Sequence, residues 1–100
     1  MTVIVEIAVD PIGTGSTSVG DLIKYAVSAI ARRGYKYQVC AMGTVVELPS
    51  LKDVGSLLED IHEELVKRGV KRIVSVVRID DRRDKSESIE YKVSRVTQNR

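Results

Sequence analysis

Residues 10–18 read Asp-Pro-Ile-Gly-Thr-Gly-Ser-Thr-Ser, and they separate an extended apolar segment from a helical one. Before them, residues 2–9 are β-branched and almost continuously apolar, which is typical of a strand inside a sheet. After them, apolar residues recur at helical spacing, at Val19, Leu22, Ile23, Ala26, Val27 and Ile30. The stretch therefore marks a strand-to-helix junction. No Gly-Lys-Ser/Thr follows it, so it is either a loop that holds an anion or polar ligand, or a well-capped turn.

Two helical segments end in the same way. The first has Ser18 as its expected N-cap and ends at Arg32-Arg33-Gly34. The second has Ser50 as its expected N-cap and ends at Lys67-Arg68-Gly69. Its apolar stripe is Leu51, Val54, Leu57, Leu58, Ile61 and Leu65. Because a strand is expected after each helix, the two units form a weak internal repeat.

The remaining segments are expected to be strands. Residues 35–40 and 44–48 form a predicted hairpin around Ala41-Met42-Gly43, and residues 70–80 and 88–97 form two further predicted strands. The order is βαββαβ with an additional C-terminal strand. It predicts an α+β, ferredoxin-like sandwich with an antiparallel sheet and both helices on one face. The strand at 70–80 is apolar on both sides, so we expect a partner to cover the open face.

Composition limits the classes of protein. One hundred residues, 43% hydrophobic and 30% charged, predict a single domain over residues 1–100. A net charge of +2 is too small to indicate nucleic-acid binding by itself. The single Cys40 excludes an internal disulfide, and the absence of an 18-residue apolar run or a leader gives no indication of a membrane. We therefore expect a cytoplasmic protein.

Few residues suggest a catalytic or metal site. His62 and Cys40 are too few for a metal ion that needs three or four ligands, so neither a metal nor a cofactor is expected. Ser18, His62 and Asp80 include the residue types of a hydrolase triad, but no nucleophile elbow or suitable spacing accompanies them. No catalytic residue is therefore predicted.

Several motifs, in order, resemble the small thiamine-binding-protein family, also known as YkoF-like. They are Val3-Ile4-Val5-Glu6-Ile7, Pro11-Ile12-Gly13-Thr14-Gly15 with Ser18-Val19, Met42-Gly43-Thr44-Val45-Val46-Glu47, His62-Glu63, Arg72-Ile73, Ile79-Asp80 with Arg82, and Lys92-Val93. The resemblance spans nearly the whole chain. It implies a ferredoxin-like protomer assembled into homodimers or homotetramers, binding thiamine or its hydroxymethylpyrimidine precursor, with no established catalysis. This chain departs from the family at Leu48, where glycine is usual.

An aminopyrimidine ligand requires a carboxylate or amide for its ring nitrogen and amino group, an apolar or sulfur-bearing surface for its face, and hydroxyls for its edge. If the loop packs over the hairpin, the candidate ligand-binding residues are Gly13, Gly15, Thr17, Ser18, Tyr37, Met42, Thr44 and Glu47. Each also has a purely structural interpretation. Ser18 can cap a helix, Met42 can fill the core, and Glu47 can be a charge at a strand end.

Two other function classes remain open. The first is an RNA-binding module of the ferredoxin-like fold, which presents aromatic side chains on its central strands. The tyrosines lie elsewhere, at Tyr25, Tyr35, Tyr37 and Tyr91, so nucleic-acid binding is not expected. The second is a small metabolic enzyme, in which Glu47 or Asp80 would be the titratable group at the ligand.

Overall fold

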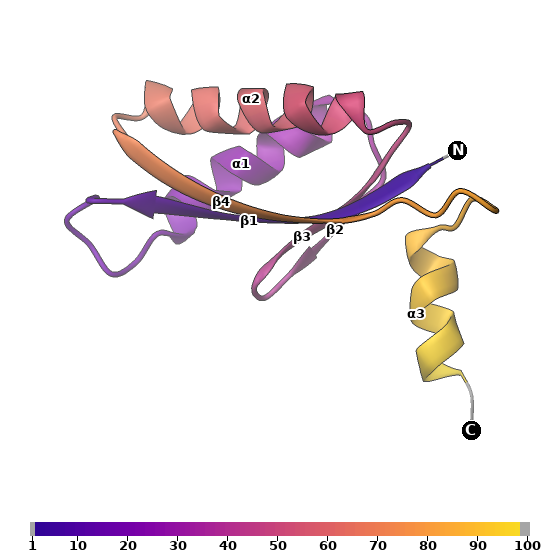
Figure 1. Cartoon of the computed structure of the whole chain (residues 1–100). Helices are drawn as coiled ribbons and strands as arrows, with labels where there is room; N and C mark the ends of the chain where they lie inside the picture. The colour runs from indigo at the N-terminus through magenta and orange to yellow at the C-terminus, as the bar shows by residue number, and fades with distance from the viewer. Residues whose placement is uncertain (1, 99–100) are drawn as a thin grey trace.

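The computed structural model describes residues 2–98 as four strands and three helices. In chain order they are β1 (Val3–Ile12), α1 (Gly20–Arg32), β2 (Tyr37–Cys40), β3 (Gly43–Leu48), α2 (Lys52–Lys67), β4 (Arg72–Asp80) and α3 (Ile89–Thr97). The strands form one antiparallel sheet in the order β2-β3-β1-β4. Helices α1 and α2 cover the same face of that sheet (Figure 1). This is the predicted ferredoxin-like α+β fold.

The core lies between the sheet and helices α1 and α2. Alternate residues of β1 point to this side because side chains on a strand alternate between faces. The buried residues are Val3, Val5 and Ile7 of β1, Val46 and Leu48 of β3, Ala26, Ala29 and Ile30 of α1, and Val54, Leu57 and Ile61 of α2. Burying one large aliphatic side chain stabilises the fold by about 1.5–3 kcal/mol, so this layer is the main source of stability.

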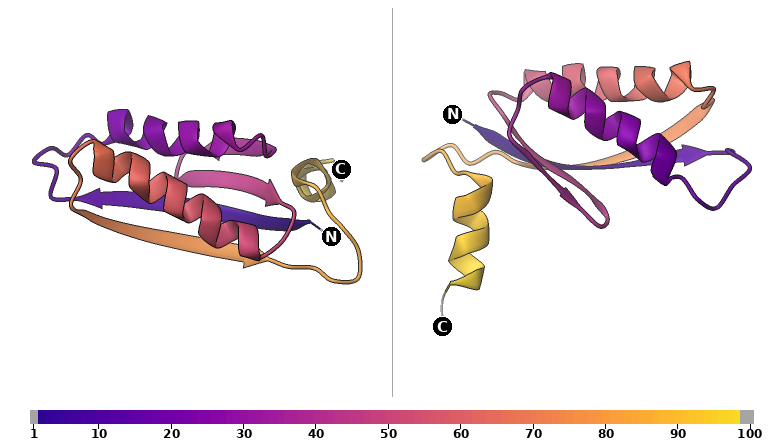
Figure 2. Two further views of the ribbon diagram at one scale, coloured as in Figure 1. Left: turned by 90° about the horizontal axis from the view of Figure 1, so that it is seen from above. Right: turned by 180° about the vertical axis from the view of Figure 1, so that it is seen from behind.

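Polar contacts also join the two covering helices. The Arg33 Nε atom donates to Asp60 Oδ2 at 2.6 Å, and the same guanidinium reaches Ser56 Oγ at 2.7 Å. Arg32 Nη2 donates to Glu64 Oε1 at 2.7 Å. The predicted helix ends are confirmed, since Gly34 and Gly69 follow α1 and α2 with φ of 75° and 90°. The two views of Figure 2 show both helices side by side above the sheet.

The predicted C-terminal strand over residues 88–97 is wrong, because this segment is helix α3. The Ser88 hydroxyl caps the helix by accepting from the backbone N–H of Tyr91 at 3.0 Å. Ile89, Val93 and Val96 then recur at helical spacing, and Ile89 is buried. Helix α3 projects from the side of the sheet opposite α1 and α2 (Figure 1). The sandwich therefore carries an additional helix in place of an additional strand.

The predicted N-caps of the first two helices are also wrong. The cap residue of α1 is Val19, without a side-chain hydrogen bond, so the Ser18 hydroxyl does not cap it. The cap residue of α2 is Leu51, one residue beyond Ser50. The Ser50 hydroxyl instead donates to Asp53 Oδ2 at 2.8 Å, within the same first turn. The residue types at these starts were suitable, but the backbone enters the helix later.

Candidate ligand pocket

A cavity lies where the β2–β3 hairpin stops and β1 continues. Strand β3 pairs with β1 only as far as Thr44, which is opposite Ile7. Strand β1 then continues to Ile12, paired on its other side with β4. Beyond the hairpin turn, the part of β1 that α1 covers therefore has no neighbouring strand on the β3 side. This leaves a cavity of about 220 Å³ between the hairpin, β1 and α1.

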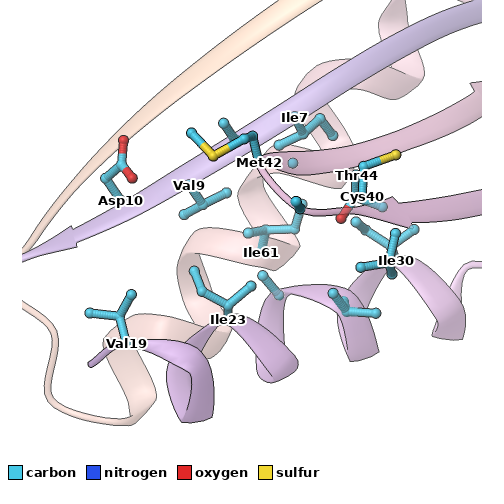
Figure 3. A pocket seen from close by; sticks show the side chains of 16 residues that line it. Ile7, Val9, Asp10, Val19, Ile23, Ile30, Cys40, Met42, Thr44 and Ile61 are labelled. Carbon is cyan, nitrogen blue, oxygen red and sulfur yellow. The ribbon is translucent and has the colours of Figure 1, made fainter. Parts of the chain in front are cut away.

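The walls of the cavity are mostly apolar. Strand β1 and the helices contribute Ile7, Ala8, Val9, Val19, Ile23, Ala26, Val27, Ile30 and Ile61. The hairpin contributes Val39, Cys40, Ala41, Met42, Gly43 and Thr44. Figure 3 shows Val19, Ile23 and Ile30 along the helix and Met42 on the strand side. Such a lining suits a small apolar or aromatic ring.

Few polar groups reach this cavity. Thr44 is 6% exposed and is the one polar residue among the buried residues of the described chain. The Cys40 thiol lies 3.9 Å from the carbonyl oxygen of Gln38. Asp10 is the charged residue in the lining, but strand alternation directs its side chain to the face opposite that of Val9. Recognition here would therefore depend on hydroxyl, sulfur and backbone groups rather than on an ion pair.

Gly43 brings the hairpin close to β1. A Cβ atom at this position would lie 3.0 Å from the carbonyl oxygen of Ile7, which is a backbone atom. The sequence Met-Gly-Thr at the turn was the signal that this position required a glycine. The close approach fixes Met42 and Thr44 beside Ile7 in the middle of β1, at the cavity.

The structure brings two of the predicted ligand-binding residues to the cavity, Met42 and Thr44. Met42 lies at the hairpin tip and is 87% exposed, and Thr44 is buried. The loop residues Gly13, Gly15, Thr17 and Ser18 are exposed and lie outside the lining. Gly13 and Gly15 do have the predicted positive φ, at 76° and 79°.

The loop is organised by its own hydroxyl groups. The Thr14 hydroxyl donates to the carbonyl oxygen of Ser16 at 3.2 Å, and the Ser16 hydroxyl accepts from the N–H of Ser18 at 3.0 Å. The segment connects two residues that line the cavity, Asp10 and Val19. It therefore flanks the cavity without contributing to its walls.

Tyr37 and Glu47 do not meet the other candidates. Tyr37 is opposite Val46 on the edge strand, is 38% exposed, and lies outside the lining. Glu47 is three residues after Thr44 on one strand, so its side chain points to the opposite face of the sheet. Its Oε2 atom accepts from the backbone N–H of Ile89 at 2.8 Å. Glu47 therefore contacts the start of α3 rather than the cavity.

The geometry does not assemble the alternatives. His62 Nε2 lies 2.6 Å from Ser75 Oγ, and Asp80 pairs with Lys92, so no Ser18–His62–Asp80 triad forms. Within residues 2–98, no three His, Cys, Asp or Glu side chains are placed to hold a metal ion. The open face of the central strands carries Ile4, Glu6, Ala8, Val45 and Glu47, which offer no aromatic surface for bases. None of the described helices is long and apolar enough to cross a membrane.

Comparisons with known sequences give matches along nearly the whole chain. The model of a family described as thiamine-binding protein matches residues 5–97. A UPF0045 protein of Methanothermobacter thermautotrophicus is 33% identical over 91 residues, which is 91% of this chain and 92% of the relative. The UPF0045 protein YqgV of Bacillus subtilis is 35% identical over 97 residues, covering 93% of this chain and 92% of the relative.

Solved structures show the same fold. The hypothetical protein MJ1052 of Methanocaldococcus jannaschii superposes with a TM-score of 0.85 and 31% identity, over 98% of both chains. A Thermotoga maritima protein, provisionally assigned to thiamine biosynthesis or salvage, superposes with a TM-score of 0.79 and 27% identity. That match covers 95% of this chain and 98% of the other.

Proposed function

The chain belongs to the thiamine-binding protein family, and on that premise we propose that it is a non-catalytic, oligomeric protein that binds thiamine or its hydroxymethylpyrimidine precursor. The family supports a role in binding a small molecule. The provisional assignment of the Thermotoga maritima protein to thiamine biosynthesis or salvage supports the choice of ligand. The cavity beside α1 is the proposed site.

The observation that carries this proposal is the apolar cavity with Met42 and Thr44 at its hairpin side. Its volume of about 220 Å³ is below the roughly 300–1,000 Å³ of sites for drug-sized ligands, and suits one substituted ring. The Met42 thioether can lie against a ring, since sulfur makes favourable contacts with aromatic groups. The Thr44 hydroxyl can donate to a ring nitrogen or accept from an amino group.

The remaining candidates take outer positions in this proposal. Gly13, Gly15, Thr17 and Ser18 flank the cavity, and they would contact the part of a ligand that protrudes from it. Tyr37 lies on the same sheet face, along the edge strand from Val39, and would reach the ligand only at the rim. The role of Glu47 is different, because its carboxylate holds α3 on the opposite face.

The oligomer in this proposal is supported by the open face of the sheet. Ile12, Val74 and Val76 are 41%, 42% and 56% exposed, and strand alternation places them opposite α1 and α2. A second copy of the chain would cover these side chains, giving a homodimer or, through a further contact, a homotetramer. Stable interfaces bury about 800 Å² per partner.

Calorimetric titration tests the proposed function. The full chain is titrated separately with thiamine, its phosphates and hydroxymethylpyrimidine. We expect saturable binding of thiamine or hydroxymethylpyrimidine. Where both bind, saturating the protein with one compound should remove the heat of binding of the other. Because one cavity serves both, the two must compete. A flat response to both thiamine and hydroxymethylpyrimidine contradicts the proposal.

A further inference from the structure

The C-terminal segment, residues 81–98, contains five cationic side chains and four carboxylates. Three of its carboxylates are paired within the segment, Asp81 with Arg83 at 2.7 Å, Asp84 with Arg82 at 2.6 Å, and Glu87 with Arg82 at 3.2 Å. The fourth, Glu90, pairs with Lys36 of the body at 2.5 Å, and Asp80 binds Lys92 at 2.6 Å. Within residues 2–98, Lys85 and Arg95 are therefore left without a carboxylate at salt-bridge distance.

Both of these cations meet at one oxygen atom. Lys85 Nζ and Arg95 Nη1 each lie 3.0 Å from the Tyr91 Oη atom. Lys85 comes from the loop before α3, and Arg95 follows Tyr91 by one helical turn. The Lys85 ammonium also lies 4.6 Å from the centroid of the Tyr91 ring, a cation–π contact. A neutral phenol orients the two cations but does not compensate their charge, so they repel each other.

We propose that Lys85, Tyr91 and Arg95 form a binding site for a phosphate group. An ammonium, a guanidinium and a phenolic hydroxyl all donate hydrogen bonds, and a phosphate dianion supplies several acceptor oxygens and the missing negative charge. Lys85 and Tyr91 line a shallow, open hollow that also contains Ser86 and Ser88.

The two carboxylates that line the same hollow are already engaged. Glu47 accepts from the N–H of Ile89, and Glu87 binds Arg82 and Lys92. Neither lies within salt-bridge distance of Lys85. The pKa of the Tyr91 phenol is lowered by the hydrogen bond from Lys85 and then by that from Arg95, as expected where positive charge is uncompensated. The site is exposed, so binding is expected to weaken as salt rises.

The phosphate can be a free ion or part of a phosphate ester, and both present the same dianion. Helix α3 lies on the side of the sheet opposite α1 (Figure 1), and the ligand cavity is lined by α1, so the phosphate site is independent of the proposed function. Failure of one therefore leaves the other intact.

Carbon-13 NMR of the tyrosine rings in the full chain tests this site. The Tyr91 resonance is assigned with Tyr91→Phe, and inorganic phosphate is added against sodium chloride at matched ionic strength. We expect a saturable shift at Tyr91 and a rise in its pKa toward the ordinary value, because the bound anion removes the stabilisation of the phenolate. Lys85→Gln and Arg95→Gln should each weaken binding several-fold.

Lys71→Gln is the matched control, because Lys71 is exposed and has no carboxylate at salt-bridge distance within the described chain. It should bind phosphate like the unmodified protein. Phenyl phosphate provides the second arm: tighter binding than inorganic phosphate identifies an ester, and equal binding identifies the free ion. An identical response to chloride, or unchanged binding in the folded Lys85→Gln/Arg95→Gln double variant, would overturn the proposal.

Discussion

The carboxylate of Glu47 in β3 accepts a 2.8 Å hydrogen bond from the backbone N–H of Ile89, the first residue of α3. An anionic group is favourable at this position because the first N–H groups of a helix lack intrahelical partners and carry partial positive charge. Ile89 itself is buried. The pair therefore anchors α3 to the sheet.

Replacing Glu47 by alanine should loosen α3 and leave ligand binding unchanged. The loss of a charge-assisted hydrogen bond at a helix start costs about 1–2 kcal/mol. Hydrogen exchange should show faster exchange in α3, and Glu63→Ala, an exposed glutamate on α2, should not. If Glu47→Ala lost thiamine binding while α3 stayed protected from hydrogen exchange, Glu47 would belong to the ligand site.

Replacing Gly43 by alanine should destabilise the protein. The added Cβ would lie 3.0 Å from the backbone oxygen of Ile7, so the hairpin must shift away from β1 at a cost of about 1–3 kcal/mol. Gly55→Ala is the control. Gly55 lies inside α2 with open space around it, so alanine there should stabilise by about 0.5–1 kcal/mol. Urea unfolding measures both, and equal effects would contradict the packing described at Gly43.

The Arg33–Asp60 pair predicts a dependence of stability on acid pH. The hydrogen bond from Arg33 lowers the pKa of Asp60 in the folded protein. The contribution of the pair is therefore present above the unfolded pKa of about 3.9, and is lost as pH falls through the lower folded value. Asp60→Asn should lose less stability between pH 5 and pH 2 than the unmodified protein, and Glu59→Gln should not differ from it.

High salt should reduce this difference, because the carboxylate is about half exposed and the interaction is screened. Chemical unfolding at several pH values checks the prediction. A parallel acid response in the unmodified protein and in Asp60→Asn would show that the pair contributes nothing.

The open sheet face predicts how assembly responds to charge. Val76→Lys should dissociate the oligomer, because it places an unpaired charge in an apolar contact. Val66→Lys is a matched control, since Val66 is 59% exposed on α2 and Val76 is 56% exposed on β4. Sedimentation velocity at micromolar concentration distinguishes them. A monomer for the unmodified protein, or equal assembly of both variants, would contradict the proposed interface.

Most of the fold could be predicted from the sequence because the apolar spacing differs between helices and strands. The repeated endings at Gly34 and Gly69 also located the C-terminal ends of both covering helices correctly. The exception was residues 88–97. Their β-branched residues, Val93, Val96 and Thr97, fit a strand as well as a helix. The local signals for the helix were the Ser88 cap and the spacing of Ile89, Val93 and Val96, and the contact of Ile89 with Glu47 then holds the helix against the sheet.

The site could be predicted only in part. Met42 and Thr44 were predicted because they supply a sulfur-bearing surface and a hydroxyl at the hairpin, and both line the cavity. The opposite directions of the Glu47 and Thr44 side chains could have been predicted from strand geometry alone, because residues three apart on a strand lie on opposite faces. The cavity itself depends on β1 continuing to Ile12 past the hairpin turn, whereas the apolar pattern indicated an end at Val9.

The most direct test of the central claim is to fill the mouth of the cavity and measure ligand affinity by calorimetry. Val39 is 55% exposed and lines the cavity, so Val39→Phe should block it without changing the core. Val66→Phe makes the same substitution at a similarly exposed position outside the cavity. We predict that Val39→Phe weakens thiamine and hydroxymethylpyrimidine binding at least about tenfold, or about 1.4 kcal/mol, while Val66→Phe binds normally. Unchanged affinity in a folded Val39→Phe protein would contradict the account and place the ligand elsewhere.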